Sequence, residues 1–299
     1  MKAYVLGVVG VVIFGMTFPM TRLAVGTPEL PQFSPSLSAF ARAAVAGLLS
    51  LCYLAITSQL SGIKRLTRAE QISLVVTSLC VVFGFPLLTA WALRYVEAIH
   101  AAVLIGFLPL ATAGLGAWMA HQRPSLGFWL CAAVGSALVV IYAVLHNQGS
   151  SWLFHPADLL LVLAVFCAAV GYAKGAALTQ RLGGAEVICW ALVIALPISL
   201  PVTLLLLPSS NLAAIGVPAW VGFTYISVFS MWLGFFAWYK ALALGGTVRI
   251  SQIQLLQPMF SMMFAVPILG ERLDLMTLVF AIAVLATVFI GKRMPVRAN

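Results

Sequence analysis

The sequence predicts an all-α integral membrane protein with ten transmembrane helices, arranged as two inverted five-helix repeats. Three observations lead to this prediction. Of the 299 residues, 63% are hydrophobic and only 8% are charged, whereas about a quarter of the residues in a soluble domain are charged. Roughly ten apolar stretches of about 20 residues follow one another, each long enough to cross about 30 Å of hydrocarbon as a helix. The second half of the chain also repeats features of the first.

The first five predicted spans cover residues 4–25, 35–57, 70–93, 98–119 and 126–145. The first begins just after Lys2 and is too long for the apolar core of a cleavable signal. No clear small-residue cleavage site follows it, so we expect it to be retained. The second contains Arg42 about a third of the way along. The third, fourth and fifth are continuously apolar.

The second five predicted spans cover residues 157–179, 186–207, 218–242, 247–269 and 274–291. Lys174 lies about two-thirds of the way along the sixth span, Lys240 closes the eighth, and Pro258 offers a bend in the ninth. Strands of an outer-membrane barrel alternate apolar and polar residues. Because these runs are apolar without alternation, helices are predicted throughout.

The repeat is detected by an ungapped alignment of the two halves. The alignment pairs Pro109 with Pro258 and Arg123 with Arg272, and it keeps the spacing between the two pairs. Isolated matches between apolar helices carry little weight, because few residue types are in use. These two pairs are therefore the informative ones.

We expect the first repeat to cover residues 1–147 and the second to cover residues 156–293. Five helices is an odd number, so the second repeat must enter the membrane upside down relative to the first. Ten helices place both termini on one side. Most basic residues fall on that side, so the positive-inside rule places both termini in the cytoplasm of a multi-pass protein of the inner (plasma) membrane.

The formal charge of +9 follows from this asymmetry and from anionic lipid. The expected partners are a small-molecule substrate and the lipid bilayer, with no nucleic acid, and a homodimer is left open. All five cysteines lie at scattered positions inside spans, so neither disulfides nor a metal site is expected. The loops are too short for a soluble catalytic domain, and we expect neither enzymatic activity nor a cofactor.

Two short segments carry a family likeness. The sequence LLQP at 255–258, followed by LGERL at 269–273, resembles the closing helices of the EamA branch of the drug/metabolite transporter superfamily, and Arg42 is similar to that family's arginine in the second span. The first copy departs from the family pattern by reading AHQR at 120–123, and Gln257 stands where relatives often carry Glu. The resemblance implies an exporter of amino acids or related metabolites that works by alternating access, with sugar-phosphate and nucleotide-sugar exchangers as more distant kin.

Charged residues inside the hydrocarbon are expensive and mark candidate functional sites. Arg42 and Lys174 lie well inside their spans, and Lys240 ends an aromatic stripe on span eight. The stripe comprises Tyr225, Phe229, Trp232, Phe236 and Lys240, whose spacing places them on one helix face. Such a face can hold a ring or acyl body together with a carboxylate. Snorkelling of the cations and ordinary aromatic packing are the alternatives.

Three further residues complete the set of candidate cavity residues. Gln254 and Gln257 lie on one face around Pro258, where they either contact polar cargo or hydrogen-bond neighbouring helices. Trp91 falls opposite Lys240 in the repeat alignment. The full set is Arg42, Trp91, Lys174, Tyr225, Trp232, Lys240, Gln254 and Gln257.

The acidic residues set limits on mechanism. None of the seven lies near the middle of a span, and the histidines are also peripheral, so we expect export or exchange without a carboxylate relay. The alternatives are an exchanger of phosphorylated sugars or nucleotide sugars, a channel, and an intramembrane enzyme. The last needs a His/Asp/Glu constellation within a span, which the sequence does not show.

Overall fold

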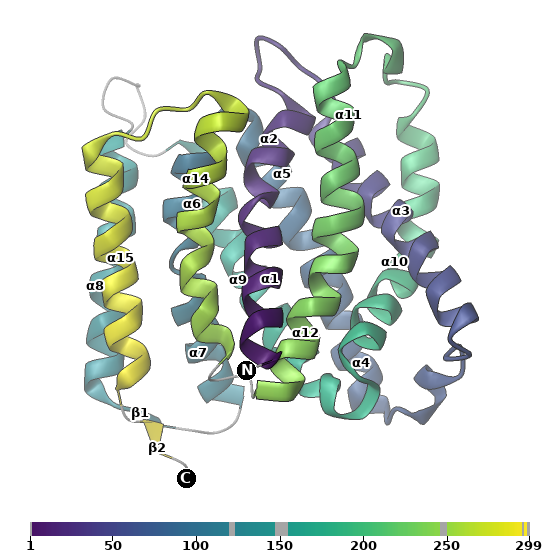
Figure 1. Ribbon diagram of the computed structural model, residues 1–299, viewed down its shortest axis with the longest axis horizontal. Coiled ribbons are helices and arrows are strands. Elements are labelled where there is room, and N and C mark those ends of the chain that lie inside the picture. The colour runs from purple at the N-terminus through teal and green to yellow at the C-terminus, as the bar shows by residue number, and fades with distance from the viewer. Residues whose placement is uncertain (1, 120–122, 147–154, 246–249, 295, 298–299) are drawn as a thin grey trace.

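The computed structural model describes residues 2–119, 123–146, 155–245, 250–294 and 296–297 (Figure 1). Its first half contains α1 (Lys2–Gly15), α2 (Thr17–Val25), α3 (Pro35–Ile56), α4 (Arg68–Thr77), the π-helix η2 (Ser78–Gly84), α5 (Phe85–Tyr95), α6 (Ala98–Ile105), α7 (Leu108–Met119) and α8 (Leu126–His146). Its second half contains α9 (Pro156–Leu182), α10 (Gly184–Leu206), α11 (Val217–Thr224), the π-helix η4 (Tyr225–Leu233), α12 (Gly234–Gly245), the 3₁₀ helix η5 (Ser251–Leu256), α14 (Gln257–Leu269) and α15 (Leu275–Arg293).

The remaining elements are short. The 3₁₀ helices η1 (Gly62–Arg65) and η3 (Leu212–Ala214) lie in connections between longer helices. The two-residue strands β1 (Arg123–Pro124) and β2 (Val296–Arg297) pair in antiparallel fashion and join the start of α8 to the C-terminal tail.

The helices confirm a multi-pass membrane fold. Among the described residues, six helical segments are long and apolar enough to cross a membrane, and four shorter apolar helices accompany them. These ten segments coincide with the ten predicted spans, although residues 247–249 of the ninth span lie outside the described part of the chain. That the four shorter helices also cross the membrane stays a prediction.

The repeat seen in the sequence is present in the order and length of the helices. Counterpart helices begin 149 residues apart in five cases: α3 and α10, α4 and α11, α5 and α12, α7 and α14, and α8 and α15. The π-helix η2 also has its counterpart, because a shift of 149 residues places Ser78–Gly84 on the last seven residues of η4. The first helix is an exception, since it is interrupted at Met16 whereas α9 is continuous.

The two repeats are inverted and packed together along their whole length. The N-terminus begins α1 at the end of the bundle where the C-terminus also lies (Figure 1). The second repeat begins at the opposite end, where Asp158 of α9 contacts His100 near the start of α6. The most extensively packed pairs are α3 with α10, α1 with α12, α8 with α15 and α5 with α9. The α3–α10 and α8–α15 pairs each join a helix to its own counterpart in the other repeat. The α1–α12 pair of one repeat corresponds to the α9–α5 pair of the other.

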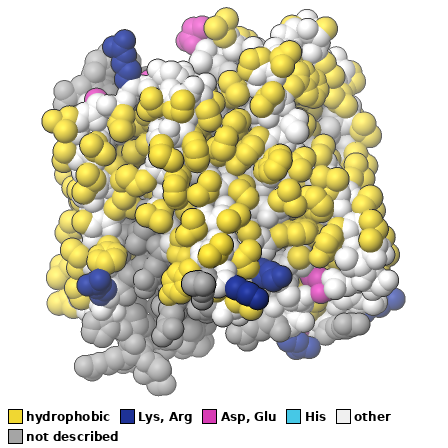
Figure 2. Space-filling model, in the orientation of Figure 1, with side chains coloured by type: hydrophobic (Ala, Val, Ile, Leu, Met, Phe, Trp, Pro, Cys, Tyr) yellow, Lys and Arg dark blue, Asp and Glu magenta, His cyan; other side chains and the backbone are white. Residues whose placement is uncertain are grey.

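The surface of the bundle matches a bilayer. Hydrophobic side chains cover the visible face between the two ends, and the charged side chains seen there gather near the ends (Figure 2). Polar caps fix several helix starts: the Ser34 side chain accepts a hydrogen bond from the amide of Leu37, and the Asp274 carboxylate accepts one from Thr277. The helix starts are thereby set by hydrogen bonds as well as by packing.

Candidate substrate-binding site

A buried polar centre lies where the two repeats meet. Arg42 projects from α3 and is only 3% exposed. Its Nη2 donates to Oγ of Ser230 in η4 over 3.5 Å, and this Oγ lies 2.8 Å from Oγ1 of Thr17, the first residue of α2. The centre thus connects the break in the first helix, the second span and the π-helix of the eighth span.

Arg42 has no acidic partner among the residues that the structure describes. Its Nε and Nη1 atoms are buried and have no hydrogen-bond partner among the described residues. None of the seven acidic residues lines the small cavity that Arg42 faces. A guanidinium carries five N–H donors and is always charged, and an unpaired buried charge is costly. The site is therefore suited to receive an anionic group.

Four aromatic rings also line this cavity. The rings of Phe14 and Phe235 lie 4.9 Å apart, and those of Tyr172 and Phe235 lie 6.1 Å apart, and Phe85 lines the cavity beside them. The cavity volume is about 20 Å³, which is room for about one water molecule. The cavity beside Arg42 is therefore too small, as it stands, to hold a metabolite.

Larger pockets lie at the two ends of the bundle. The pocket at the end opposite the termini has a volume of about 440 Å³, and Arg22, Glu97 and Glu271 line it. The pocket at the termini end has a volume of about 570 Å³, and Lys240 and Glu186 line it. The polar centre at Arg42 thus lies between two solvent-accessible pockets and is closed toward both.

A carboxylate closes the end opposite the termini. Glu271, between α14 and α15, accepts hydrogen bonds from the backbone amides of Ala98 and Ile99 over 2.8 Å each. These are the first two residues of α6, so a residue of the second repeat caps a helix of the first. Burial raises the pKa of the Glu271 carboxyl, and the two amide hydrogen bonds oppose part of that rise. The Glu of the Gly-Glu-Arg motif therefore joins the two repeats.

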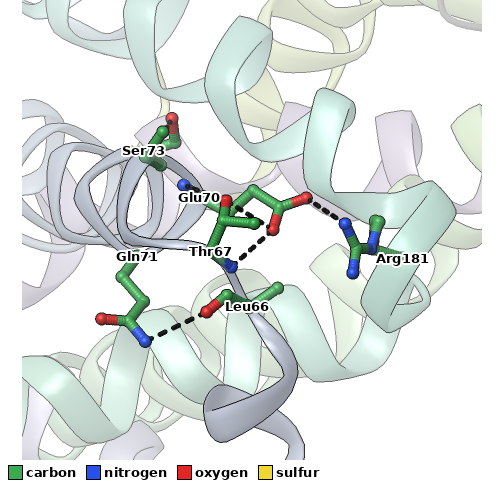
Figure 3. A network of polar contacts seen from close by, with 7 residues as sticks. Leu66, Thr67, Glu70, Gln71, Ser73 and Arg181 are labelled. Carbon is green, nitrogen blue, oxygen red and sulfur yellow. Dashed lines mark hydrogen bonds and ion pairs between the residues drawn. The ribbon is translucent and has the colours of Figure 1, made fainter.

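An ion pair joins the repeats at the termini end (Figure 3). Nη1 of Arg181, near the end of α9, lies 3.0 Å from Oε1 of Glu70 in the first turn of α4. The other carboxylate oxygen of Glu70 accepts from the amide and hydroxyl of Thr67 over 2.8 and 2.9 Å, forming a capping box. Both ends of the bundle are therefore held by polar contacts between the repeats.

Among the candidate residues, Gln257 shares the cavity with Arg42. Gln257 is 5% exposed, begins α14 and lines the same cavity. Gln254 is also buried, and its side-chain nitrogen donates to Oε1 of Gln257 over 3.4 Å. The structure thus brings three of the eight candidates, Arg42, Gln254 and Gln257, to the centre of the molecule.

The predicted aromatic stripe divides into two pairs. Tyr225 stacks on Phe229 with ring centroids 5.4 Å apart, and its hydroxyl donates to the carbonyl of Ile13 in α1. Trp232 packs edge-on against Phe236 at 5.1 Å, and both contact Tyr53 of α3. The π-helix η4 causes the division, because its i→i+5 hydrogen bonding widens the turn between the pairs.

Three candidates lie away from Arg42. Lys240 is exposed and lines the pocket at the termini end. Trp91 is 40% exposed and its indole nitrogen donates to Ser36 over 3.3 Å. Lys174 is partly buried on α9 and makes no hydrogen bond or ion pair among the described residues.

Several polar residues of the interior were not singled out in the sequence. Thr17, Tyr172 and Ser230 line the central cavity. No sequence signal singles out these three residues, because hydroxyl side chains are common in membrane helices. His100 and Asp158 lie in the first turns of α6 and α9, which agrees with their predicted positions near span ends. They form a buried pair with Nε2 and Oδ1 2.7 Å apart, joining α6 to α9. Only the fold brings these two residues together.

Comparisons with known proteins agree with a two-repeat transporter fold. The model of the EamA-like transporter family matches residues 1–144 and 155–291. The uncharacterized transporter YdeK of Bacillus subtilis (strain 168) is 42% identical over 292 residues, which cover 98% of this chain and 97% of the relative. The uncharacterized transporter YyaM of the same organism is 24% identical over 256 residues, covering 84% and 81%. A solved crystal structure has a TM-score of 0.62 at 15% identity, covering 96% of this chain and 95% of that chain, which is a likeness of fold alone.

Proposed function

Because the chain belongs to the EamA-like transporter family, we propose that it is a secondary transporter that exports a small carboxylate-bearing metabolite, the class that includes amino acids, by alternating access. The membrane is the inner (plasma) membrane, with both termini in the cytoplasm. The family and the relatives are transporters, which favours transport over catalysis.

The observation that carries this proposal is the unpaired guanidinium of Arg42. It lies buried between the repeats, two of its nitrogens lack hydrogen-bond partners among the described residues, and no carboxylate lines its cavity. A carboxylate accepts two parallel hydrogen bonds from a guanidinium and cancels its charge. The cargo would therefore supply the counter-ion that the protein does not.

Alternating access is supported by the closures at the two ends. Glu271 holds the start of α6 at one end, and Arg181 holds the start of α4 at the other. Each contact joins one repeat to the other, and a pocket lies at each end. Rocking of the repeats that opens one end and keeps the other closed would expose Arg42 to one side at a time.

A single cation favours a carboxylate over a phosphorylated cargo. Among the described residues that line the central cavity, Arg42 is the only lysine or arginine. A phosphate ester carries about −1.5 to −2 charges at pH 7, so one guanidinium would leave it undercompensated. We therefore place sugar-phosphate and nucleotide-sugar exchange second.

The test measures the metabolites in the spent medium of three cell cultures. The cultures produce the intact protein, the Arg42→Gln variant or the Lys64→Gln variant, in equal amounts in the membrane. The intact protein and the Lys64→Gln control, which changes an exposed cation, should enrich the same carboxylate in the medium. Arg42→Gln should reduce that enrichment at least about tenfold, because a charged hydrogen-bonded contact is worth about 1.5–3 kcal/mol. Unchanged export by Arg42→Gln would remove the basis of the proposal.

A further inference from the structure

We propose that the cargo is a monocarboxylate with an aromatic or similarly apolar body and without an ammonium group. The carrier would then favour an arylalkyl carboxylate over the α-amino acid of the same shape. This inference rests on the proposed function, because it concerns the cargo of the same central cavity, and it narrows the class of compound that binds Arg42.

The positions of the acidic residues carry the first step. All seven lie in the described part of the chain, and each lies near one end of the bundle: Glu29, Glu97, Asp158, Glu271 and Asp274 at the end opposite the termini, and Glu70 and Glu186 at the termini end. None lines the cavity of Arg42. An ammonium group that entered this cavity would lose its hydration and would find no carboxylate there to pair with.

Charge balance gives the second step. A monocarboxylate paired with Arg42 makes the occupied site neutral overall. A zwitterion brings its own positive charge, so the occupied site would keep one uncompensated charge inside the bundle, where such charges are expensive. The site therefore discriminates between two molecules that differ only in an amino group.

Three of the four neutral side-chain oxygens that line this cavity already take part in hydrogen bonds. The hydroxyls of Thr17 and Ser230 bond to each other over 2.8 Å, and Oε1 of Gln257 accepts from Gln254. An ammonium group needs acceptors for three donors. It would have to share these oxygens with the hydrogen bonds they already make, whereas a carboxylate needs only the donors that Arg42 already offers.

The wall of the cavity gives the third step. Phe14, Phe85, Tyr172 and Phe235 line it, and Phe14 also packs edge-on against Trp238 with ring centroids 6.2 Å apart. Aromatic rings provide a large apolar surface and prefer tilted or offset contacts with other rings. The cavity therefore pairs one cation with an aromatic wall, which is complementary to a ring that carries a carboxylate.

Both π-helices border this cavity. Val81 of η2 lines it from the first repeat, and Ser230 and Met231 of η4 line it from the second. Wide turns of this kind occur often at functional sites. Their position next to Arg42 supports this cavity, rather than either end pocket, as the place where cargo is recognised.

The test uses three compounds that share a phenyl ring and a two-carbon chain. These are 3-phenylpropanoate, L-phenylalanine and 2-phenylethylamine, titrated by calorimetry into the full-length protein in lipid nanodiscs. We expect 3-phenylpropanoate to bind at least tenfold more tightly than L-phenylalanine and 2-phenylethylamine to bind weakest. Arg42→Gln should weaken 3-phenylpropanoate at least tenfold, Arg42→Lys should retain more of the binding, and Lys64→Gln should match the intact protein.

The outcomes separate the inference from the proposed function. If L-phenylalanine binds as tightly as 3-phenylpropanoate and Arg42→Gln weakens both, the inference is overturned and carboxylate recognition by Arg42 stands. If 2-phenylethylamine binds tightest, or if a folded Arg42→Gln binds all three as the intact protein does, both are overturned. Failure of the folded intact protein to bind any of the three overturns the inference, while export profiling of the Arg42→Gln variant still decides the proposed function.

Discussion

The guanidinium of Arg42 donates to Ser230 and keeps two nitrogens without partners among the described residues. In a protein that only had to be stable, a buried cation of this kind would be replaced by an apolar side chain, because removing an unpaired charge from the interior relieves a large desolvation cost. The cost is understandable if the counter-ion arrives with the cargo. Arg42 would then destabilise the empty protein and stabilise the protein that holds its cargo.

A prediction at the residue scale concerns the pH dependence of Glu271. Burial raises the pKa of its carboxyl above the ordinary value of 4.5, so the folded protein holds this proton more tightly than the unfolded chain does. The stability that this group contributes is therefore full below pH 4.5 and is lost as pH rises through the raised pKa, with no further change above it. Unfolding measured against pH should show this slope in the intact protein and lack it in Glu271→Gln.

The matched control is Glu29, an exposed carboxylate at the same end of the bundle. Hydrogen bonds from its own backbone amide and from the Thr27 side chain lower the pKa of Glu29. Its contribution has the opposite sign, being present at neutral pH and lost as pH falls through the lowered pKa. If Glu29→Gln and Glu271→Gln change the pH profile in the same direction, the assignment of the slope to the buried carboxyl is wrong.

The sequence predicted part of this chemistry. Arg42 and Gln257 stand out because charges and amides are rare in apolar spans. Thr17, Tyr172 and Ser230 do not stand out, because hydroxyl residues are common in membrane helices and only the fold turns these three toward Arg42. The pairing of the Glu271 carboxylate with the amides of α6 depends on a contact between residues 172 and 173 positions apart, which a single sequence does not reveal.

At the scale of elements, the π-helices determine which side chains reach the centre. In η4, Ser230 and Met231 line the cavity, while Phe229 and Trp232 are not among the described residues that line it. An α-helix over the same residues would keep the aromatic stripe together and would turn the following residues to other positions. The wide turn therefore places Ser230 within hydrogen-bond distance of Arg42, and the helix is irregular over these residues.

Deleting Val228 should convert η4 to a regular α-helix, because a π-bulge contains one residue more than an α-helix of the same length. One residue of α-helix corresponds to a rotation of about 100°. The deletion should therefore rotate the segment that contains Ser230 relative to the residues before position 228, and Ser230 should no longer face Arg42. We expect 3-phenylpropanoate binding to be lost while the protein remains in the membrane. Val228→Ala keeps the residue count and should bind normally, and binding that survives the deletion would show that the wide turn is dispensable.

The helices themselves were predicted more closely than their irregularities. The predicted start of the second span at residue 35 is the observed start of α3, and the other boundaries lie within a few residues for the long helices. Continuous apolar runs account for that agreement. The break at Met16 and both π-helices were not predicted, because residue spacing alone was interpreted with the period of a regular α-helix.

At the scale of the whole molecule, each end of the bundle is closed by a polar contact between the repeats. The two contacts differ in strength. Glu271 is partly buried and accepts two amide hydrogen bonds, whereas Arg181 and Glu70 are 54% and 22% exposed. Exposed ion pairs contribute only about 0–1 kcal/mol. The termini end should therefore be the easier one to open.

Replacing Arg181 tests this expectation. Arg181→Gln removes the ion pair and should raise the population open at the termini end by up to about fivefold, the ratio that corresponds to about 1 kcal/mol. The readout is the alkylation rate of Met231→Cys, a buried position in the central cavity, in a background without the five native cysteines. Arg181→Lys keeps the charge and should leave the rate nearly unchanged. Equal rates in all three proteins would mean that the pair does not hold this end closed.

The overall architecture was predicted because a repeat constrains many residues at once. The pairs Pro109 with Pro258 and Arg123 with Arg272 give the same offset that relates the starts of α7 and α14 and of α8 and α15. The odd number of predicted helices per repeat then implies the inversion. The repeat boundaries at residues 147 and 156 remain a prediction, and residues 120–122, where the first copy departs from Gly-Glu-Arg, lie outside the described residues.

The matching π-helices have a consequence for the history of the protein. A wide turn is uncommon, and η2 and η4 share seven positions one repeat apart. Two independent insertions at equivalent sites would be a coincidence, so the irregular turn belonged to a single five-helix ancestor before its gene was doubled. Two copies of such a five-helix chain, inserted in opposite directions, would place one bulge from each copy beside the central cavity, as η2 and η4 lie here. Arg42 breaks this symmetry, because its counterpart in the second repeat is Ala191, so only one half supplies a cation to the centre.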